Sequence, residues 1–253
     1  MRRCSDTAPS PAVLMLWGGV VAALLLSCRP LGWAAAMPGW TEIRGEERIQ
    51  LLERLRERQR KVQAVRATVA QRKRHPLLKE EAVSEGTLLF QRPDRLRWEV
   101  AKPERTIILI DRQTLLTYRP ERKEAERRDL RQDFASRAAV EFLTAAMDLA
   151  LDDLEKRFRV DLFREQDRTL LVLTPRSRLV AEALASIAIS LSDEDAVPRG
   201  ITVVGQKGDR TETTLSHVTI NPQLSEGAFL LELGPAVRVR DVPGPAGEVA
   251  GGR

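Results

Sequence analysis

The two histidines, His75 and His217, are the side chains of this sequence best suited to metal or acid–base chemistry. His75 stands between an arginine and a proline, His217 lies in an alternating stretch, and no acidic cluster with ligand spacing accompanies either one. The acid-rich stretches Asp152-Asp153 and 193–195 have the character of a helix surface and a turn, not of paired catalytic carboxylates. Phosphate-binding and nucleophile-elbow motifs do not occur in the sequence. These residues therefore predict a protein without a metal, a cofactor or an enzymatic activity.

The first 36 residues have the pattern of an export signal. Arg2 and Arg3 precede a charge-free apolar run, Ala12–Ser27, which is too short for a comfortable membrane span of about 20 residues. Small residues up to Ala36 predict cleavage there, so that residues 1–36 form a signal peptide and the protein acts in the periplasm.

Cys28 allows a second interpretation of the same segment. Leu25-Leu26-Ser27-Cys28 resembles a lipobox, in which the cysteine is acylated and becomes the N-terminus of a lipid-anchored protein. Cleavage after Ala36 would instead remove Cys28 and Cys4, the only two cysteines, and with them any disulfide or thiol chemistry. An uncleaved anchor is a third alternative.

The charge balance argues against nucleic-acid binding. The sequence has 41 basic and 36 acidic residues, and removal of residues 1–36 leaves 38 and 35, a net charge of +3. Acidic residues interrupt the basic ones throughout, and aromatic residues make up only 4% of the sequence, which leaves little to stack on bases.

The apolar pattern predicts a mainly β (α+β) fold. Residues 46–74 are expected to form one long amphipathic helix that ends before Pro76, because Leu51, Leu55, Val62 and later valines fall near one stripe. A second helical region is expected over residues 133–157. The remaining segments alternate with period two, and they predict about eleven antiparallel strands in residues 37–241, followed by a disordered Pro/Gly-rich tail at 242–253. The expected strands are 86–92, 94–102, 106–111, 114–119, 123–130, 158–165, 168–175, 187–191, 200–206, 209–221 and 228–233.

One strand shows the expected division between its two faces. In residues 94–102, Leu96, Trp98 and Val100 alternate with charged residues, so the apolar three are expected to face a hollow between sheet and helices. A register shifted by one residue would exchange the two faces.

Residues 86–126 resemble the signature region of the LolA family, the periplasmic carriers of outer-membrane lipoproteins. The matching motifs, in order, are Arg92-Pro93, Arg97-Trp98, Pro103, Asp111 and Tyr118-x-Pro120. The segment 208–241 resembles the family's last strands, and the resemblance extends over about residues 46–241. Two departures stand out: Asp111 is followed by arginine where the family has glycine, and the next strand has leucines where aromatic residues are common.

This resemblance implies an incomplete antiparallel β-barrel with an N-terminal helix and a helical lid over its concave side. It implies a monomeric carrier whose cargo is acylated lipoproteins. The carrier would receive them from an inner-membrane lipoprotein-releasing ABC transporter and deliver them to an outer-membrane lipoprotein receptor. No nucleic-acid partner is expected. It also implies that Arg92 hydrogen-bonds to the lid and holds it closed. The residues expected to line the acyl-chain cavity are Leu88, Phe90, Leu96, Trp98, Val100, Leu109, Phe142 and Met147.

Several alternatives remain at this point. The cargo could be another lipid or glycolipid. A protein of the same fold lipidated at Cys28 would be a membrane-anchored lipoprotein receptor at the outer membrane. A third hypothesis is an envelope-stress sensor domain that binds a protein rather than lipid.

Overall fold

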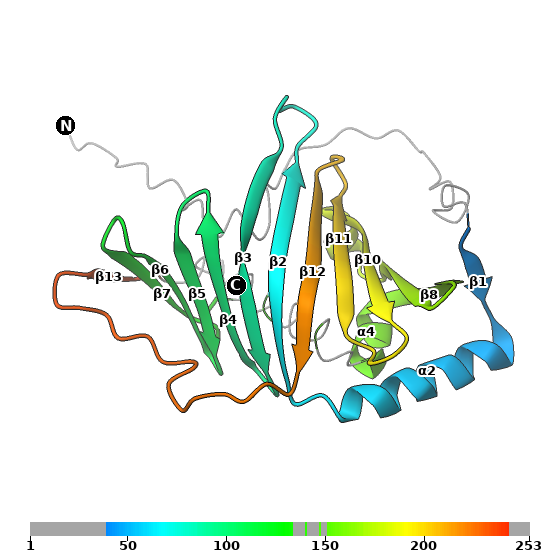
Figure 1. The fold of residues 1–253 in the computed structure, drawn as a ribbon. Helices are drawn as coiled ribbons and strands as arrows, with labels where there is room; N and C mark the ends of the chain where they lie inside the picture. The colour runs from blue at the N-terminus through cyan, green and yellow to red at the C-terminus, as the bar shows by residue number, and fades with distance from the viewer. Residues whose placement is uncertain (1–38, 134–139, 141–146, 148–150, 243–253) are drawn as a thin grey trace, which may run out of the picture.

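The computed structural model describes residues 39–133, 140, 147 and 151–242, which build one curved sheet of thirteen strands with helices at one end (Figure 1). The strands are β1 (Thr41–Ile43), β2 (Ala64–Arg74), β3 (Ala82–Gln91), β4 (Arg95–Lys102), β5 (Thr106–Asp111), β6 (Thr114–Arg119), β7 (Glu124–Asp129), β8 (Phe158–Glu165), β9 (Arg168–Pro175), β10 (Leu184–Ser192), β11 (Pro198–Gly205), β12 (Arg210–Ile220) and β13 (Arg238–Asp241). The helices are α2 (Gly45–Arg60), α4 (Leu151–Arg157) and α5 (Arg178–Ala181).

The strand order is β1-β8-β9-β10-β11-β12-β2-β3-β4-β5-β6-β7-β13. All pairings are antiparallel except that of β13, which runs parallel to β7. β1 and β13 stand at the two ends of this order, so the sheet is an open, incomplete barrel. The predicted fold class is therefore confirmed, although the strand number is thirteen and not about eleven. Ten of the predicted strands correspond to β3–β12, the one at 228–233 does not form, and β1, β2 and β13 were not predicted.

The predicted helix over residues 46–74 is wrong in its second half. Helix α2 ends at Arg60, and β2 then pairs with β3 and β12 in the middle of the sheet. Val65, Ala67 and Val69 are buried while the residues between them are exposed, which is the period of a strand. Because valines at 62, 65 and 69 also fit a helical stripe, only the pairing with two neighbouring strands decides between the two structures.

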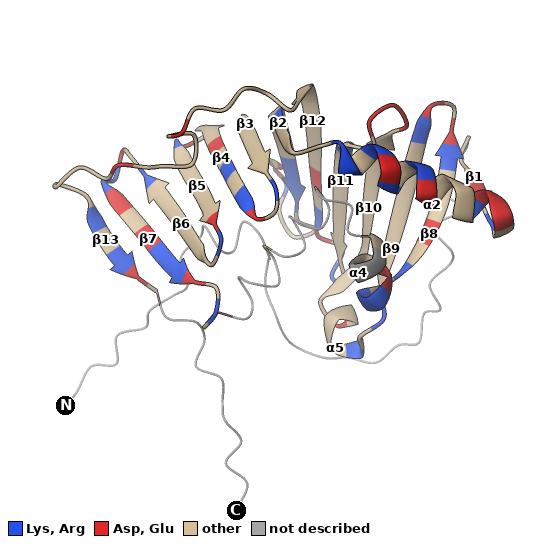
Figure 2. Cartoon of the chain, turned by 90° about the horizontal axis from the view of Figure 1, so that it is seen from below, with Lys and Arg blue, Asp and Glu red and all other residues tan. Residues whose placement is uncertain are grey.

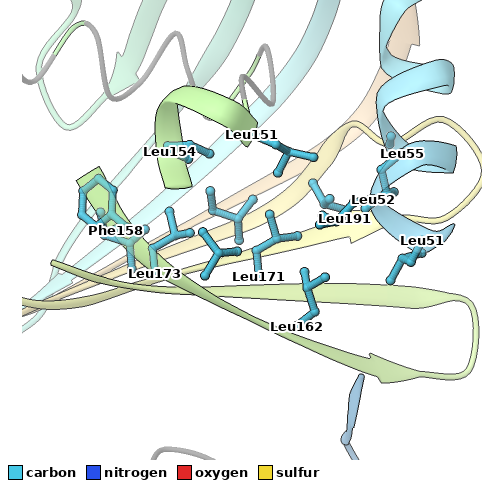
Figure 3. Packing of buried hydrophobic residues seen from close by; sticks show 14 of the residues in the cluster. Leu51, Leu52, Leu55, Leu151, Leu154, Phe158, Leu162, Leu171, Leu173 and Leu191 are labelled. Carbon is cyan, nitrogen blue, oxygen red and sulfur yellow. The ribbon is translucent and has the colours of Figure 1, made fainter. Parts of the chain in front are cut away.

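One end of the concave face is filled by the first of three apolar clusters (Figure 3). Leucines of α2 and α4 pack there against β8, β9 and β10, and Leu55, Leu171 and Leu173 are fully buried. Acidic residues occupy the first turn of α2 and basic residues the last, the arrangement that the helix dipole favours. This cluster fixes the position of α2 over the sheet.

The predicted helical region at 133–157 is helical wherever the structure describes it after Asp133: at Val140, at Met147 and in α4. Val140 and Met147 lie over the middle of the concave face, where both are buried in the second apolar cluster. The fold thus includes helical residues on the concave side, as expected.

The predicted strand at 228–233 is wrong. This segment has no strand pairing and instead crosses the outer face of β4, where the Arg97 guanidinium donates to the carbonyls of Ala228 (3.2 Å) and Leu230 (3.0 Å). Phe229 is 4% exposed, with the Arg95 guanidinium 5.4 Å from its ring centroid. The apolar residues of this segment therefore cover one face of the sheet rather than extend it.

The predicted signal peptide at 1–36, with Cys28, lies outside the described residues. The predicted tail at 242–253 begins within them, since the Val242 N–H donates to the Arg127 carbonyl at 2.9 Å and continues the edge pairing by one residue. None of the described helices is both long enough and apolar enough to cross a membrane.

Candidate functional site

The second apolar cluster, called here the central cluster, occupies the concave face from β12 to β6. It has no charged member, and two of its residues come from the helical region above the sheet. Its members are Val62, Val65, Ala67, Val69, Leu88, Phe90, Leu96, Trp98, Ile110, Leu115, Leu130, Val140, Met147, Val197 and Leu215.

Strand register explains why the predicted residues meet in this cluster. Leu88 is paired with Trp98 and Phe90 with Leu96, so these four side chains project from adjacent positions on one face. Val100 follows on the same face and packs against the edge of the cluster. The structure thus brings together Leu88, Phe90, Leu96, Trp98, Val100 and Met147, as the list of candidates anticipated, while Phe142 lies outside the described residues.

Leu109 is a correction to that list. It is paired with Arg97, so its side chain lies on the outer face, opposite the central cluster. Its neighbours Ile108 and Ile110, paired with Trp98 and Leu96, occupy the concave face in its place. Residues 107–110 are apolar throughout, because both faces of β5 are largely buried, and alternation could not distinguish the two faces here.

Three further cluster residues, Val65, Val69 and Leu115, were missed for related reasons. The two valines were assigned to a helix, although in β2 they are paired with Phe90 and Gly86 and face the cluster. Leu115 lies in a strand that was predicted correctly. Its pairing partner on β7 is the charged Arg128, so the sequence of β7 gave no sign that Leu115 faces an apolar cluster.

A buried hydrogen-bond chain connects the turn after β3 with the helical region over the cluster. The Arg92 guanidinium donates to the Gln59 side-chain oxygen through Nη2, and Gln59 Nε2 donates to the Met147 carbonyl at 2.7 Å. Gln59 is only 2% exposed. Arg92 therefore reaches Met147 through Gln59.

Gln59 was not among the predicted site residues, yet the sequence contained a signal for it. Leu51, Leu52 and Leu55 form the buried stripe of α2, and Gln59 follows Leu55 by four residues, where the stripe requires an apolar side chain. A polar residue at such a position must find hydrogen-bond partners inside the protein.

A group of buried charged side chains on β6, β7 and the turn after β7 follows the apolar cluster. The ribbon of β7 is coloured mostly as charged residues (Figure 2). Arg119 is paired with Glu126 (Nη1–Oε1, 3.5 Å), and Arg128 with Asp133 (Nη1–Oδ2, 3.2 Å); all four residues are less than 10% exposed. Arg240 on β13 adds a contact to Glu126 at 3.3 Å. The apolar face is thus bounded by α2 and α4 on one side and by paired charges on the other.

A polar groove of about 900 Å³ lies beyond this boundary, between the β5–β6 turn and the edge formed by β7 and β13. Arginines and aspartates line much of it, including Arg112, Asp129 and Arg131. The Arg131 guanidinium (Nη2–Oδ2, 2.6 Å) and then the Arg131 backbone N–H (2.9 Å) donate to the Asp129 carboxylate, and they lower the pKa of Asp129 to about 2. This charged lining does not suit acyl chains.

The family comparison agrees with this architecture. Residues 60–232, more than half of the sequence, match the family model described as "Outer membrane lipoprotein carrier protein LolA". The chain belongs to the LolA family. The match begins at the last residue of α2 and includes the arginine of the Arg92–Gln59 pair, all of β2 to β12, and the segment across β4.

Two curated relatives in the LolA family carry the name outer-membrane lipoprotein carrier protein. The protein from Bordetella avium is 24% identical over 169 residues, which cover 67% of this chain and 77% of the relative. The protein from Cupriavidus pinatubonensis is 29% identical over 153 residues, which cover 60% of this chain and 68% of the relative.

Solved structures with a similar fold include an uncharacterized conserved protein from Thermus thermophilus, with a TM-score of 0.48 and 13% identity over 78% of this chain and 100% of that one. The LolA superfamily protein NE2245 from Nitrosomonas europaea has a TM-score of 0.40 and 15% identity over 72% and 96%. The MucA/MucB complex of Pseudomonas aeruginosa contains a chain with a TM-score of 0.43 and 13% identity over 76% and 63%.

Proposed function

We propose that this protein is a non-catalytic periplasmic carrier that binds the acyl chains of lipoproteins on its concave face and transfers them from the inner to the outer membrane. The observation that carries the proposal is the central cluster: an uncharged apolar face in a LolA-family chain, covered by Val140 and Met147 rather than by a second sheet. The partners are acylated lipoproteins, an inner-membrane exporter and an outer-membrane receptor.

Cargo enters when the helical region that contains Val140 and Met147 moves away from the sheet. Acyl chains then replace its side chains against Phe90, Leu96 and Trp98. Each buried methylene group contributes about 0.8 kcal/mol, so about four of them offset an opening cost of about 3 kcal/mol, a usual free-energy difference between two conformations of one protein. The closed form is the resting form, since the same apolar surface left open to water would be unfavourable.

The Arg92–Gln59 pair holds the closed form in this proposal. Its bond to the Met147 carbonyl is made while that residue lies over the cluster and is broken when the region moves away. The opening equilibrium therefore depends on Arg92, as the family resemblance implied, and also on Gln59.

Photocrosslinking from the two faces of β4 tests the binding surface. A benzophenone side chain at Val100 lies on the concave face, whereas one at Glu99 lies on the outer face of the same strand, so each position is the control for the other. Crosslinks to an acylated lipoprotein from position 100 and not from position 99 are expected. No crosslink from position 100, together with purified protein free of acyl chains by mass spectrometry, would contradict the proposed function.

A lipid-anchored receptor of the same fold is the second candidate, because Leu25–Cys28 has the lipobox pattern. The mass of the mature N-terminus separates the two. A start at residue 37 identifies the diffusible carrier, and a diacylglyceryl group on Cys28 identifies the anchored receptor.

A further inference from the structure

The indole N–H of Trp98 is a buried donor inside the central cluster. Trp98 is 8% exposed, and within the described part of the chain its Nε1 atom has no hydrogen-bond acceptor and no contact with solvent. A buried tryptophan normally has a partner for this group, and each exception requires an explanation. The Trp98 indole N–H therefore lacks an acceptor, and a bound molecule could supply one.

The surroundings of Trp98 show from which side that acceptor must come. Across the sheet the indole lies between Leu88 and Ile108, and along its own strand between Leu96 and Val100, all of them apolar. None of these side chains carries an acceptor, and the strands on both sides of β4 are paired with it. An acceptor can therefore arrive only from the concave side, where the proposed cargo binds.

We propose that the Trp98 indole N–H donates a hydrogen bond to an ester carbonyl of the bound acyl chains; this inference rests on the proposed function. A carbonyl is the first group of each acyl chain, and it is an ester carbonyl where the chain is linked to glycerol, so it is carried into the apolar site together with the methylene groups. There it needs a donor, because a carbonyl buried without one is unfavourable. Trp98 is thus the residue that distinguishes acyl esters from plain hydrocarbon chains and sets the depth to which the chains enter.

The test compares two probes that differ only in the carbonyl. One is a cysteine peptide carrying an S-dipalmitoylglyceryl group, and the other is its dialkyl ether analogue with chains of equal length. Wild-type protein is expected to bind the ester about two- to twelve-fold more tightly, the value of one net hydrogen bond. Trp98→Phe removes the donor and keeps a ring, so both probes should then bind equally.

Ile108→Val is the matched control, since it trims the neighbour of Trp98 without touching a hydrogen bond. It should weaken both probes alike and keep their ratio. Equal binding of ester and ether by wild-type protein, or an ester preference that survives in Trp98→Phe, would overturn the inference and leave the proposed function standing. Failure of wild-type protein to bind either probe would overturn both.

A spectroscopic measurement does not depend on the folding of Trp98→Phe. Trp40 is the second tryptophan of the protein that starts at residue 37, so replacing it with phenylalanine assigns the indole ¹H–¹⁵N signal of Trp98. Addition of the ester probe should move this signal downfield, as a new hydrogen bond does, and the ether probe should not. The same shift with both probes would contradict the assignment of the carbonyl.

Discussion

Substitution of Gln59 by leucine should loosen the helical region over the central cluster. The side chain is 2% exposed, donates to the Met147 carbonyl at 2.7 Å and accepts a bond from Arg92. Leucine has a similar volume and can make neither bond. Loss of a buried partner costs about 1–3 kcal/mol, which corresponds to an increase of about 5- to 160-fold in the open population if the bonds exist only in the closed form.

Hydrogen exchange of the Val140 and Met147 amides measures this opening directly, and uptake of a fluorescent palmitoyl probe measures its consequence. Both should increase in Gln59→Leu. Gln63→Leu is the matched control, because it is the same chemical change four residues later on an exposed side chain that bonds only to the Arg60 carbonyl at 3.2 Å. It should leave exchange and uptake close to wild type.

A double-mutant cycle tests whether Arg92 acts through Gln59. If it does, Arg92→Leu added to Gln59→Leu changes the opening free energy less than the sum of the two single changes. Additivity within about 0.5 kcal/mol would refute the chain of contacts, as would equal behaviour of Gln59→Leu and Gln63→Leu.

Three further predictions concern stability and pH. Asn221→Ala should lower the free energy of unfolding by about 1–2 kcal/mol in urea, because its side chain bonds three backbone groups of the α2–β2 connection; Asn221→Asp, which keeps the two accepted bonds, should lose less. Gly86→Ala should cost about 2–4 kcal/mol, since the added Cβ would lie 2.0 Å from a backbone oxygen of β4, whereas Gly200→Ala, with its nearest atom at 3.7 Å, should change stability by less than about 0.5 kcal/mol; equal effects of the two would contradict the register at the β3–β4 bulge. The Asp129 carboxyl should titrate by NMR near pH 2, and Arg131→Ala should raise its midpoint; because the folded-state pKa is lowered, this contact stabilises the protein above the ordinary pKa of 3.8 and its contribution is lost as the pH falls toward 2.

Much of the sheet followed from short-range patterns. The strands at 106–111, 114–119, 158–165 and 168–175 begin and end at the predicted residues, because two-residue turns between alternating segments define a hairpin locally. The β5–β6 turn also explains why glycine is usual in the family at residue 112: Arg112 has φ +56°, the left-handed conformation that glycine adopts more easily. The apolar face of β4 was likewise predictable, since Arg95 and Arg97 alternate strictly with Leu96 and Trp98.

Other features depended on contacts between distant segments. Leu109 and its neighbours are apolar on both sides of β5, so only the register with β4 assigns their faces. The apolar run at 228–233 has the composition of a strand, yet β4 is already paired on both sides, and the run packs on its outer face instead. Residues 62–74 fit a helix and a strand equally well until β3 and β12 provide partners.

The sequence by itself determined the fold class, the family, most strands and the apolar face of β4, because these depend on residue periodicity and local turns. Only the tertiary structure decided where α2 ends, which residues complete the central cluster, and that Arg92 reaches Met147 through Gln59. Those features join distant segments, 88 positions apart for Gln59 and Met147 and 155 for Val65 and Ile220, and no local pattern specifies which distant partner a residue will find.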